Sequence, residues 1–312
     1  MEQAVPLAKA PAAASSDSLY LQVVPLSETV SPEETEALQD SPAAVASVIE
    51  VSAPGTKEKR SDKAVIDYSN TEDGYVMVQF LKSTEKKLKC RVAGPTTTYT
   101  YTLTPKEWET FSLSDGNGKY SVTVYENVSG TKYATVLSVS FSVELRDEFA
   151  PFLLPNQYVD YQNAEKTIEK AAELTKDLKD ALRKVEAVYD YVVGNISYDK
   201  QLAKTVKSGY LPVLDDVLEK QSGICFDYAA LMAGMLRSQG VPCKLVVGYA
   251  GSAYHAWISV WTEEDGWVDG IIFFDGKEWK RMDPTFASSG NASAEIMKYI
   301  GNGENYSAKY LY

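Results

Sequence analysis

The sequence predicts an all-β sandwich followed by a domain of mixed α+β type. Residues 62–146 form short β-branched and aromatic runs that alternate with period two, which is typical of antiparallel strands. Residues 163–196 instead place apolar side chains at the three- and four-residue spacing of amphipathic helices. Beyond them a further helix is followed by strands, so the second domain combines both kinds of element.

Residues 1–60 have the composition of a disordered acidic tail or linker. Pro, Ala, Ser and Glu dominate, and Lys9 is the only basic side chain up to Thr56. Such a segment buries too little apolar surface to offset the entropy of ordering its chain. A pro-segment that fills a cleft, or a tether to a cell surface, would have the same composition.

Residues 61–147 predict the β-sandwich, of immunoglobulin-like or fibronectin-like type. Turn signals such as Gly94-Pro95 separate six strand-like runs, and no segment of helical period lies between them. Cys90 falls inside one of these runs, where we expect a small buried thiol.

A junction over residues 148–162, with two prolines, leads into the α+β domain at 163–312. Its first segment predicts two helices that break near residues 175–177. The second of them ends at Gly194-Asn195.

The balance of charge restricts the partners. The chain has 31 Lys and Arg against 43 Asp and Glu, a formal net charge of -12, which repels nucleic acid and anionic lipid. No apolar run approaches the roughly 20 residues that span a bilayer, and no intact signal peptide is present. The 21 tyrosines of the chain and its Thr- and Ser-rich first half suggest exposed β-structure, which favours an extracellular or cell-surface location, with a cytoplasmic one left open.

Cys225 is the first candidate for chemistry. Ser222-Gly223 precede an apolar stretch of helical period that Gly240 and Pro242 end, so Cys225 falls in the first turn of a buried helix. Unpaired N–H groups and the helix dipole favour a thiolate there, and they can stabilise a tetrahedral oxyanion. The alternative is a small hydrophobe in the core, the role that we expect for Cys243.

His255 is the only histidine in the chain. It lies in an alternating strand, and any cysteine–histidine mechanism must use it, because an activated nucleophile needs a base within hydrogen-bond reach. A lone histidine beside aromatic residues is also typical of a packed core.

Asp283 is the candidate for the acid that orients the imidazole. It ends a predicted strand and is held by Pro284, although an Asp-Pro pair also commonly starts a turn. Asp227 is instead expected to be a local cap or a salt-bridge partner. The competing acids lie in loops or near turns: Glu263, Glu264, Asp265 and Asp269.

The sequence lacks the residue patterns that other kinds of catalytic or binding site require. One histidine and scattered cysteines give no zinc-ligand spacing, and a G-x-S-x-G elbow is absent. The Gly-rich stretches are turns rather than phosphate loops, and nothing singles out a carboxylate pair for glycoside hydrolysis. We therefore predict no metal and no organic cofactor. With three cysteines, at least one thiol is free within a single chain.

Several motifs in order resemble the transglutaminase-like superfamily. These motifs are a G-I-C-x-D-Y-A helix start, a G-V-P turn, a V-x-G-Y strand, H-A-W and D-P-T, at residues 223–229, 240–242, 246–249, 255–257 and 283–285. Tyr198 in N-I-S-Y-D is similar to an upstream motif of the family. The resemblance covers roughly residues 190–290.

The resemblance implies a papain-like core with Cys225 as nucleophile, His255 as general base and acid, and Asp283 as the orienting residue. It also implies a thioester formed from an amide and then transferred to an amine or to water, with peptide hydrolysis favoured as in prokaryotic members. The sequence has neither the β-barrel domains of calcium-dependent animal transglutaminases nor the CxxC zinc site of peptide N-glycanases. Calcium regulation and glycanase activity are therefore not implied.

These observations predict a secreted, bacterial-type cysteine peptidase or amide acyltransferase that acts on protein or peptide substrates. The β-sandwich would bind a cell-wall or surface ligand. The alternative is a non-catalytic binding or adhesion module that retains the same fold.

Overall fold

The structure, a computed structural model, describes residues 48–263, 266–268, 272–274, 279–281 and 306–312. All of these residues belong to one compact unit of the chain, residues 44–312. No helix within the described ranges is long and apolar enough to cross a membrane.

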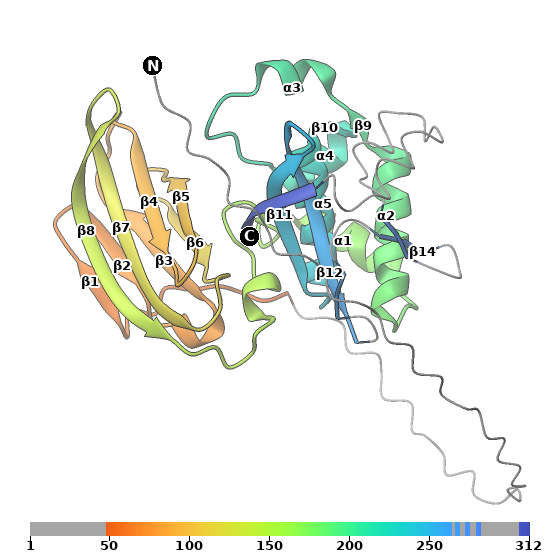
Figure 1. Cartoon of the computed structure of the whole chain (residues 1–312), viewed down its shortest axis with the longest axis horizontal. Coiled ribbons are helices and arrows are strands. Elements are labelled where there is room, and N and C mark those ends of the chain that lie inside the picture. Colours follow the sequence, from red (N-terminus) through yellow and green to blue (C-terminus); the bar gives the residue numbers. More distant parts are fainter. Residues whose placement is uncertain (1–47, 264–265, 269–271, 275–278, 282–305) are drawn as a thin grey trace, which may run out of the picture. The chain divides into compact units, whose positions relative to one another are not determined.

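Two antiparallel sheets, each with four strands, occupy the part of the described chain that precedes residue 144. The first has the order β1-β2-β3-β6, with bounds Glu58–Arg60, Ala64–Asp67, Tyr75–Phe80 and Trp108–Ser112. The second has the order β5-β4-β7-β8, with bounds Thr98–Thr102, Leu88–Ala93, Gly118–Ser129 and Lys132–Val143. Both sheets are seen in Figure 1.

All six predicted strand runs of the first domain are strands. Burial alternates along β4, where Leu88, Cys90 and Val92 are buried and the residues between them are not. The expected core position of Cys90 is thus confirmed. The immunoglobulin-like or fibronectin-like type of these sheets stays a prediction, as do the domain limits at 61–147 and 163–312.

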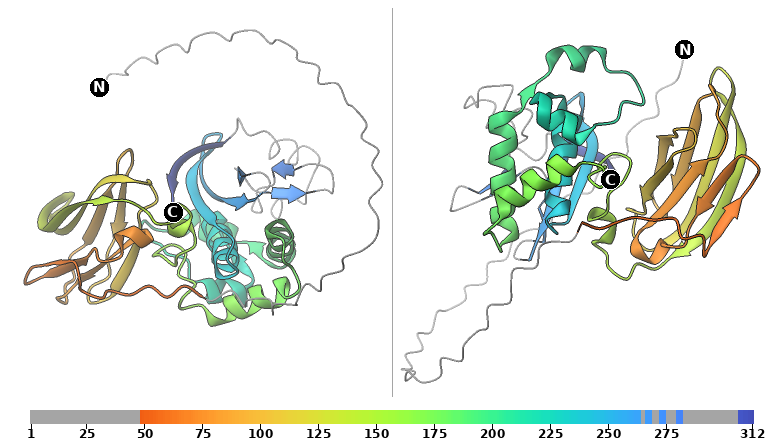
Figure 2. Two further views of the ribbon diagram at one scale, coloured as in Figure 1. Left: turned by 90° about the horizontal axis from the view of Figure 1, so that it is seen from below. Right: turned by 180° about the vertical axis from the view of Figure 1, so that it is seen from behind.

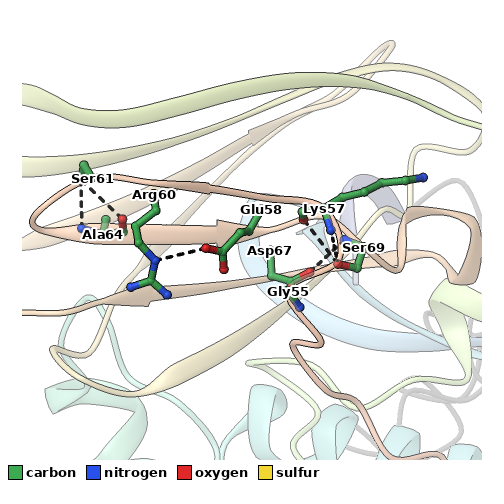
Figure 3. Close-up of polar contacts among 8 residues, drawn as sticks. All are labelled: Gly55, Lys57, Glu58, Arg60, Ser61, Ala64, Asp67 and Ser69. Atoms are coloured by element: carbon green, nitrogen blue, oxygen red, sulfur yellow. Dashed lines mark hydrogen bonds and ion pairs between the residues drawn. The ribbon is translucent and has the colours of Figure 1, made fainter.

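The predicted tail extends too far, because the structure has strand β1 at Glu58–Arg60. Hydrogen bonds hold the residues just before β1 in place (Figure 3). The backbone N–H of Gly55 donates to the Asp67 carboxylate, and that of Lys57 donates to Ser69 Oγ at 2.9 Å. The three side chains of β1 are charged and exposed. The pattern of hydrophobic residues therefore cannot predict this edge strand.

The second part of the described chain contains helices on one face of a sheet (Figures 1 and 2). The helices are α1 Glu165–Thr175, α2 Ala181–Asn195, α3 Lys200–Thr205, α4 Leu214–Lys220 and α5 Cys225–Ser238. The antiparallel sheet has the order β13-β12-β11-β16, with bounds Gly266–Val268, Ala253–Thr262, Cys243–Ala250 and Tyr306–Leu311. Two smaller pairs are β9 Ser197–Tyr198 with β10 Ser222–Gly223, and β14 Ile272–Phe274 with β15 Trp279–Arg281. Short 3-10 helices lie at Thr71–Asp73 and Ala150–Phe152.

The helix predictions are confirmed. The first helical segment breaks after Thr175, its second helix ends at Asn195, and α5 begins at Cys225. Gly240 follows α5 with φ at 75°, the left-handed conformation expected of a glycine that ends a helix. Strands β14 and β15 pair antiparallel, and residues 275–278 between them lie outside the described residues.

Helix α5 is enclosed by the rest of the domain. All its residues from Asp227 to Ser238 are buried, and it contacts α1, α2, α4, β11 and β12. A helix that is apolar on every side gains its stability from burial in a core rather than from one amphipathic stripe. The position of its first residue, Cys225, is thereby fixed by the whole domain.

Arg237, near the C-terminal end of α5, is a fully enclosed cation. Its guanidinium donates to three backbone oxygens: that of Cys243 at 2.9 Å, of Leu154 at 2.8 Å and of Tyr312 at 2.6 Å. Burial lowers the pKa of this side chain to about 10. The three acceptors come from different segments, so one side chain joins α5, the junction, β11 and the residue after β16.

Arg237→Leu should lower the free energy of unfolding by about 3 kcal/mol or more, because three buried carbonyls lose their donor. Urea denaturation followed by circular dichroism measures this change. Arg183→Leu on α2 is the matched control, since its ion pair with Glu186 is largely exposed and should contribute less than about 1 kcal/mol. Equal losses in the two variants would contradict a special role for Arg237.

Candidate active site

The start of α5 presents Cys225 to a cavity. Ile224, the residue before the helix, has extended backbone angles, and Cys225 is the first helical residue and is partly buried. The first backbone N–H groups of a helix have no acceptor within the helix and carry the positive end of its dipole. The expected helix-start position of Cys225 is confirmed. The chemistry that this position permits is attack by a thiolate beside N–H donors.

The upstream motif containing Tyr198 lies beside this helix start. Strand β9 pairs in parallel with β10, which places Tyr198 opposite Gly223. The backbone N–H of Ser197 donates to Gln221 O at 2.8 Å, and that of Asp199 donates to Gly223 O at 2.8 Å. Strand β9 thus pairs with the strand that leads directly into α5, although the two are separate in sequence.

His255 lies near the start of β12 and is 7% exposed. It stands opposite Gly248 of β11 in the antiparallel register. A Cβ atom on Gly248 would lie 2.1 Å from the backbone oxygen of Ser307 in β16 and 2.9 Å from the Trp257 ring. The glycine of the V-x-G-Y motif is therefore required by the close approach of β16, beside the strand that carries the histidine.

Cys225 and His255 line the same cavity, which has a volume of about 520 Å³. Its walls come from the α3–α4 connection, the start of α5, β11, β12 and the end of the described chain. The further lining residues are mostly aromatic or aliphatic: Tyr158, Tyr198, Ala203, Val206, Lys207, Ser208, Gly209, Tyr210, Ile224, Phe226, Val247, Tyr254, Ala256 and Tyr312.

The structure thus brings two of the three predicted catalytic residues to one cavity. Asp283 lies outside the described residues, as do the competing acids Glu264, Asp265 and Asp269. Glu263 is described and is exposed, and it does not line this cavity. The catalytic roles of Cys225, His255 and Asp283 stay predictions at this point.

Asp227 is confirmed as a local cap. Its carboxylate accepts the backbone N–H of Ile224 at 2.8 Å, which closes the first turn of α5. It also accepts the hydroxyl of Tyr210 at 2.7 Å. The hydrogen bond with Tyr210 was not predicted from the sequence, because Tyr210 lies 17 residues from Asp227 in a connecting segment.

The other two thiols are enclosed. Cys90 and Cys243 are each 0% exposed, and all three cysteines are free of disulfides. Burial raises the pKa of the Cys243 thiol to about 12, and burial also raises the pKa of Cys90. Both thiols therefore remain protonated at neutral pH, and both predictions of a core role are confirmed.

Among the described residues, no group of three or more His, Cys, Asp or Glu side chains could hold a metal ion. The side-chain donors among the lining residues are a thiol, an imidazole, several phenols, the Ser208 hydroxyl and the Lys207 ammonium. A thiol and an imidazole that line one cavity suit nucleophilic acyl chemistry better than metal binding.

Most of the aromatic wall of the cavity was not predicted from the sequence. Tyr158 and Tyr312 lie far from Cys225 in sequence but contact each other, with ring centroids 4.5 Å apart. Tyr158 also packs against Phe226, with centroids 5.3 Å apart. Phe226 follows Cys225 directly in the sequence and could have been noticed. The other two carry no local signal, because only the tertiary fold brings them to the site.

Residues 168–270 match the sequence model of the transglutaminase-like superfamily. Cys225 and His255 fall inside this match, and Asp283 lies beyond it. The match overlaps the motif-bearing segment at 190–290.

Known proteins are similar over part of the chain. The uncharacterized protein YebA of Bacillus subtilis is 26% identical over 147 residues, which are 40% of this chain and 20% of that protein. A protein-glutamine gamma-glutamyltransferase of Pseudomonas aeruginosa is 28% identical over 116 residues, 32% of this chain and 17% of that one. The chain thus spans about a fifth of the length of these relatives. A solved structure from Cytophaga hutchinsonii, assigned provisionally as a cysteine protease, aligns with a TM-score of 0.38 at 14% identity, over 82% of this chain and 73% of that chain.

A limited amount of iodoacetamide should alkylate Cys225 at least about tenfold faster than Cys90 or Cys243. The reason is that only the thiol of Cys225 is accessible, while the other two are buried and protonated. Peptide mapping by mass spectrometry measures the three rates in the native protein. Unfolding in urea should equalise them. Equal rates in the folded protein would contradict the assignment of Cys225 as the reactive thiol.

Proposed function

Because residues 168–270 form a domain of the transglutaminase-like superfamily, we propose that this chain is a cysteine acyl-transfer enzyme that acts on protein or peptide amides. The observation that carries the proposal is the shared cavity of Cys225 and His255. Cys225 stands at the start of a helix, where backbone N–H groups have no acceptor within the helix, and His255 supplies the only imidazole of the chain.

The first half of the reaction forms a thioester. The Cys225 thiolate attacks the amide carbonyl carbon, and the carbonyl electron pair moves onto oxygen, where backbone N–H groups at the start of α5 stabilise it. The C–N bond then breaks, and the leaving amine or ammonia takes a proton from the His255 imidazolium. The acyl group is now held on sulfur, and His255 is neutral.

The second half releases the acyl group. Neutral His255 takes a proton from the incoming water or amine, whose lone pair attacks the thioester carbonyl. Collapse of the tetrahedral intermediate expels the Cys225 thiolate and restores the imidazolium–thiolate pair. A thioester is hydrolysed unless the site excludes water. We therefore favour hydrolysis of peptides over amine transfer as the main outcome.

Asp283 completes the proposed triad. Its place in the D-P-T motif, after His255 in chain order, supports a role in orienting the imidazole and stabilising its protonated form. Neither the described residues nor the family match include it. Asp283→Asn is therefore the variant that tests this part of the mechanism.

The cavity lining supports a peptide substrate with apolar or aromatic neighbours to the reacting amide. Its walls are mainly aromatic and aliphatic, with phenol hydroxyls that can bind backbone amides. We also propose that the two sheets of residues 58–143 form an immunoglobulin-like sandwich that binds a cell-wall or surface ligand. Their eight antiparallel strands, in two sheets of four, support that assignment. An extracellular or cell-surface location would follow.

The purified chain should cleave peptides in a tryptic digest of casein, or convert benzyloxycarbonyl-Gln-Gly to its hydroxamate with hydroxylamine. Mass spectrometry distinguishes hydrolysis from transfer. Cys225→Ala and His255→Gln should each lower the rate by on the order of 10³-fold or more, because each removes a reacting group. Asp283→Asn should lower it as well, since the imidazole loses its orienting carboxylate.

Cys243→Ala is the matched control, because that thiol is buried away from the cavity, and its rate should stay within about twofold of wild type. A wild-type protein that converts neither probe would overturn the proposed function. Retained binding of a wall ligand by such an inactive protein would instead favour a non-catalytic module.

A further inference from the structure

Asp227 is a fully buried carboxylate, two residues after the nucleophile, with partners on two different segments. One oxygen accepts the backbone N–H of Ile224 at 2.8 Å, and the other accepts the hydroxyl of Tyr210 at 2.7 Å. A buried carboxylate is tolerated only when such donors satisfy it. The side chain therefore links the first turn of α5 to the α3–α4 connection.

The segment that carries Tyr210 is a tight turn in the cavity wall. The backbone N–H of Tyr210 donates to Lys207 O at 3.2 Å, and Gly209 has φ at 90°, as the third residue of a type II turn requires. Residues 206–210 all line the cavity. The turn fixes the backbone locally, but a further contact is needed to hold it against α5.

Gly223 makes room for that contact. A Cβ atom at this position would lie 2.6 Å from Cβ of Asp227 and 3.0 Å from Oδ2. Position 223, two residues before Cys225, therefore has no room for a larger residue, because the Asp227 side chain lies against it. Burial and the Asp227 carboxylate both raise the pKa of the Tyr210 hydroxyl, so that hydroxyl stays protonated and remains a donor.

We propose that Tyr210 and Asp227 are positioning residues for the substrate, forming a clasp that holds the turn at residues 207–210 against the nucleophile helix. Neither side chain takes part in bond making. Asp227 orders the backbone that leads into Cys225, and Tyr210 holds the cavity wall that contacts the acyl donor. The proposal deepens the proposed function, on which its kinetic half rests.

Tyr210→Phe removes one hydroxyl and leaves the rest of the clasp in place. Hydrogen exchange of residues 206–213 should rise on the order of tenfold, because a hydrogen bond to a buried carboxylate is lost. With a peptide of the casein digest as probe, KM should rise about tenfold while kcat stays within about threefold, because the wall that binds the acyl donor loosens. Iodoacetamide should still alkylate Cys225 at nearly the wild-type rate.

Tyr161→Phe is the matched control. Its hydroxyl is also buried in a strong hydrogen bond, to Leu153 O at 2.6 Å, and it does not line the cavity. This variant should lose similar thermal stability but show wild-type exchange at residues 206–213 and a wild-type KM. A general loss of stability would raise exchange and KM alike in both variants and would overturn the clasp.

Unchanged hydrogen exchange at residues 206–213 in Tyr210→Phe would overturn the proposal. So would increased exchange with no change in KM, or a fall in kcat at constant KM. A wild-type protein that converts no probe would overturn the proposed function and the kinetic role with it. Hydrogen exchange, which needs no substrate, would then still decide whether Tyr210 anchors the turn.

Discussion

The position of Cys225 at one end of α5 depends on the other end of the helix, where the buried guanidinium of Arg237 binds three backbone oxygens. These acceptors, at Leu154, Cys243 and Tyr312, belong to the junction, to β11 and to the residue after β16. A buried cation costs desolvation energy, which charge-assisted hydrogen bonds to buried acceptors offset. The helix is therefore held in one axial position, and the sheet that carries His255 is held with it.

Contacts between aromatic rings connect the start of α5 to the strands before residue 144. Phe226 packs on Tyr158, whose ring contacts those of Tyr101 in β5 and Tyr312, with centroids 5.5 and 4.5 Å apart. Ser114 adds a hydrogen bond to Leu311 O at 2.7 Å. Aromatic pairs of this kind contribute more than their buried area alone. Tyr101 of strand β5 therefore packs against the cavity wall at Tyr158.

Local pattern was enough to predict the elements that bear Cys225 and His255, because a helix start and an alternating strand are properties of neighbouring residues. Strands β1 and β6 were missed for the opposite reason. The first is charged and exposed, and the second is short and mixes Thr110 and Ser112 with Phe111, so pairing with neighbours decides their structure. The Tyr210 contact to Asp227 also depends on tertiary proximity. The D-P-T motif suggested Asp283, and its geometry lies outside the described residues.

The single imidazole gives this cavity a built-in spectroscopic label. His255 is the only histidine among 312 residues, and it faces the same space as Cys225. In a proton NMR spectrum, every imidazole C–H signal therefore arises from the cavity, without isotope labelling or assignment by mutation. Protonation of the ring, occupancy of the cavity and modification of the Cys225 thiol can each be followed in these signals, in the unaltered protein.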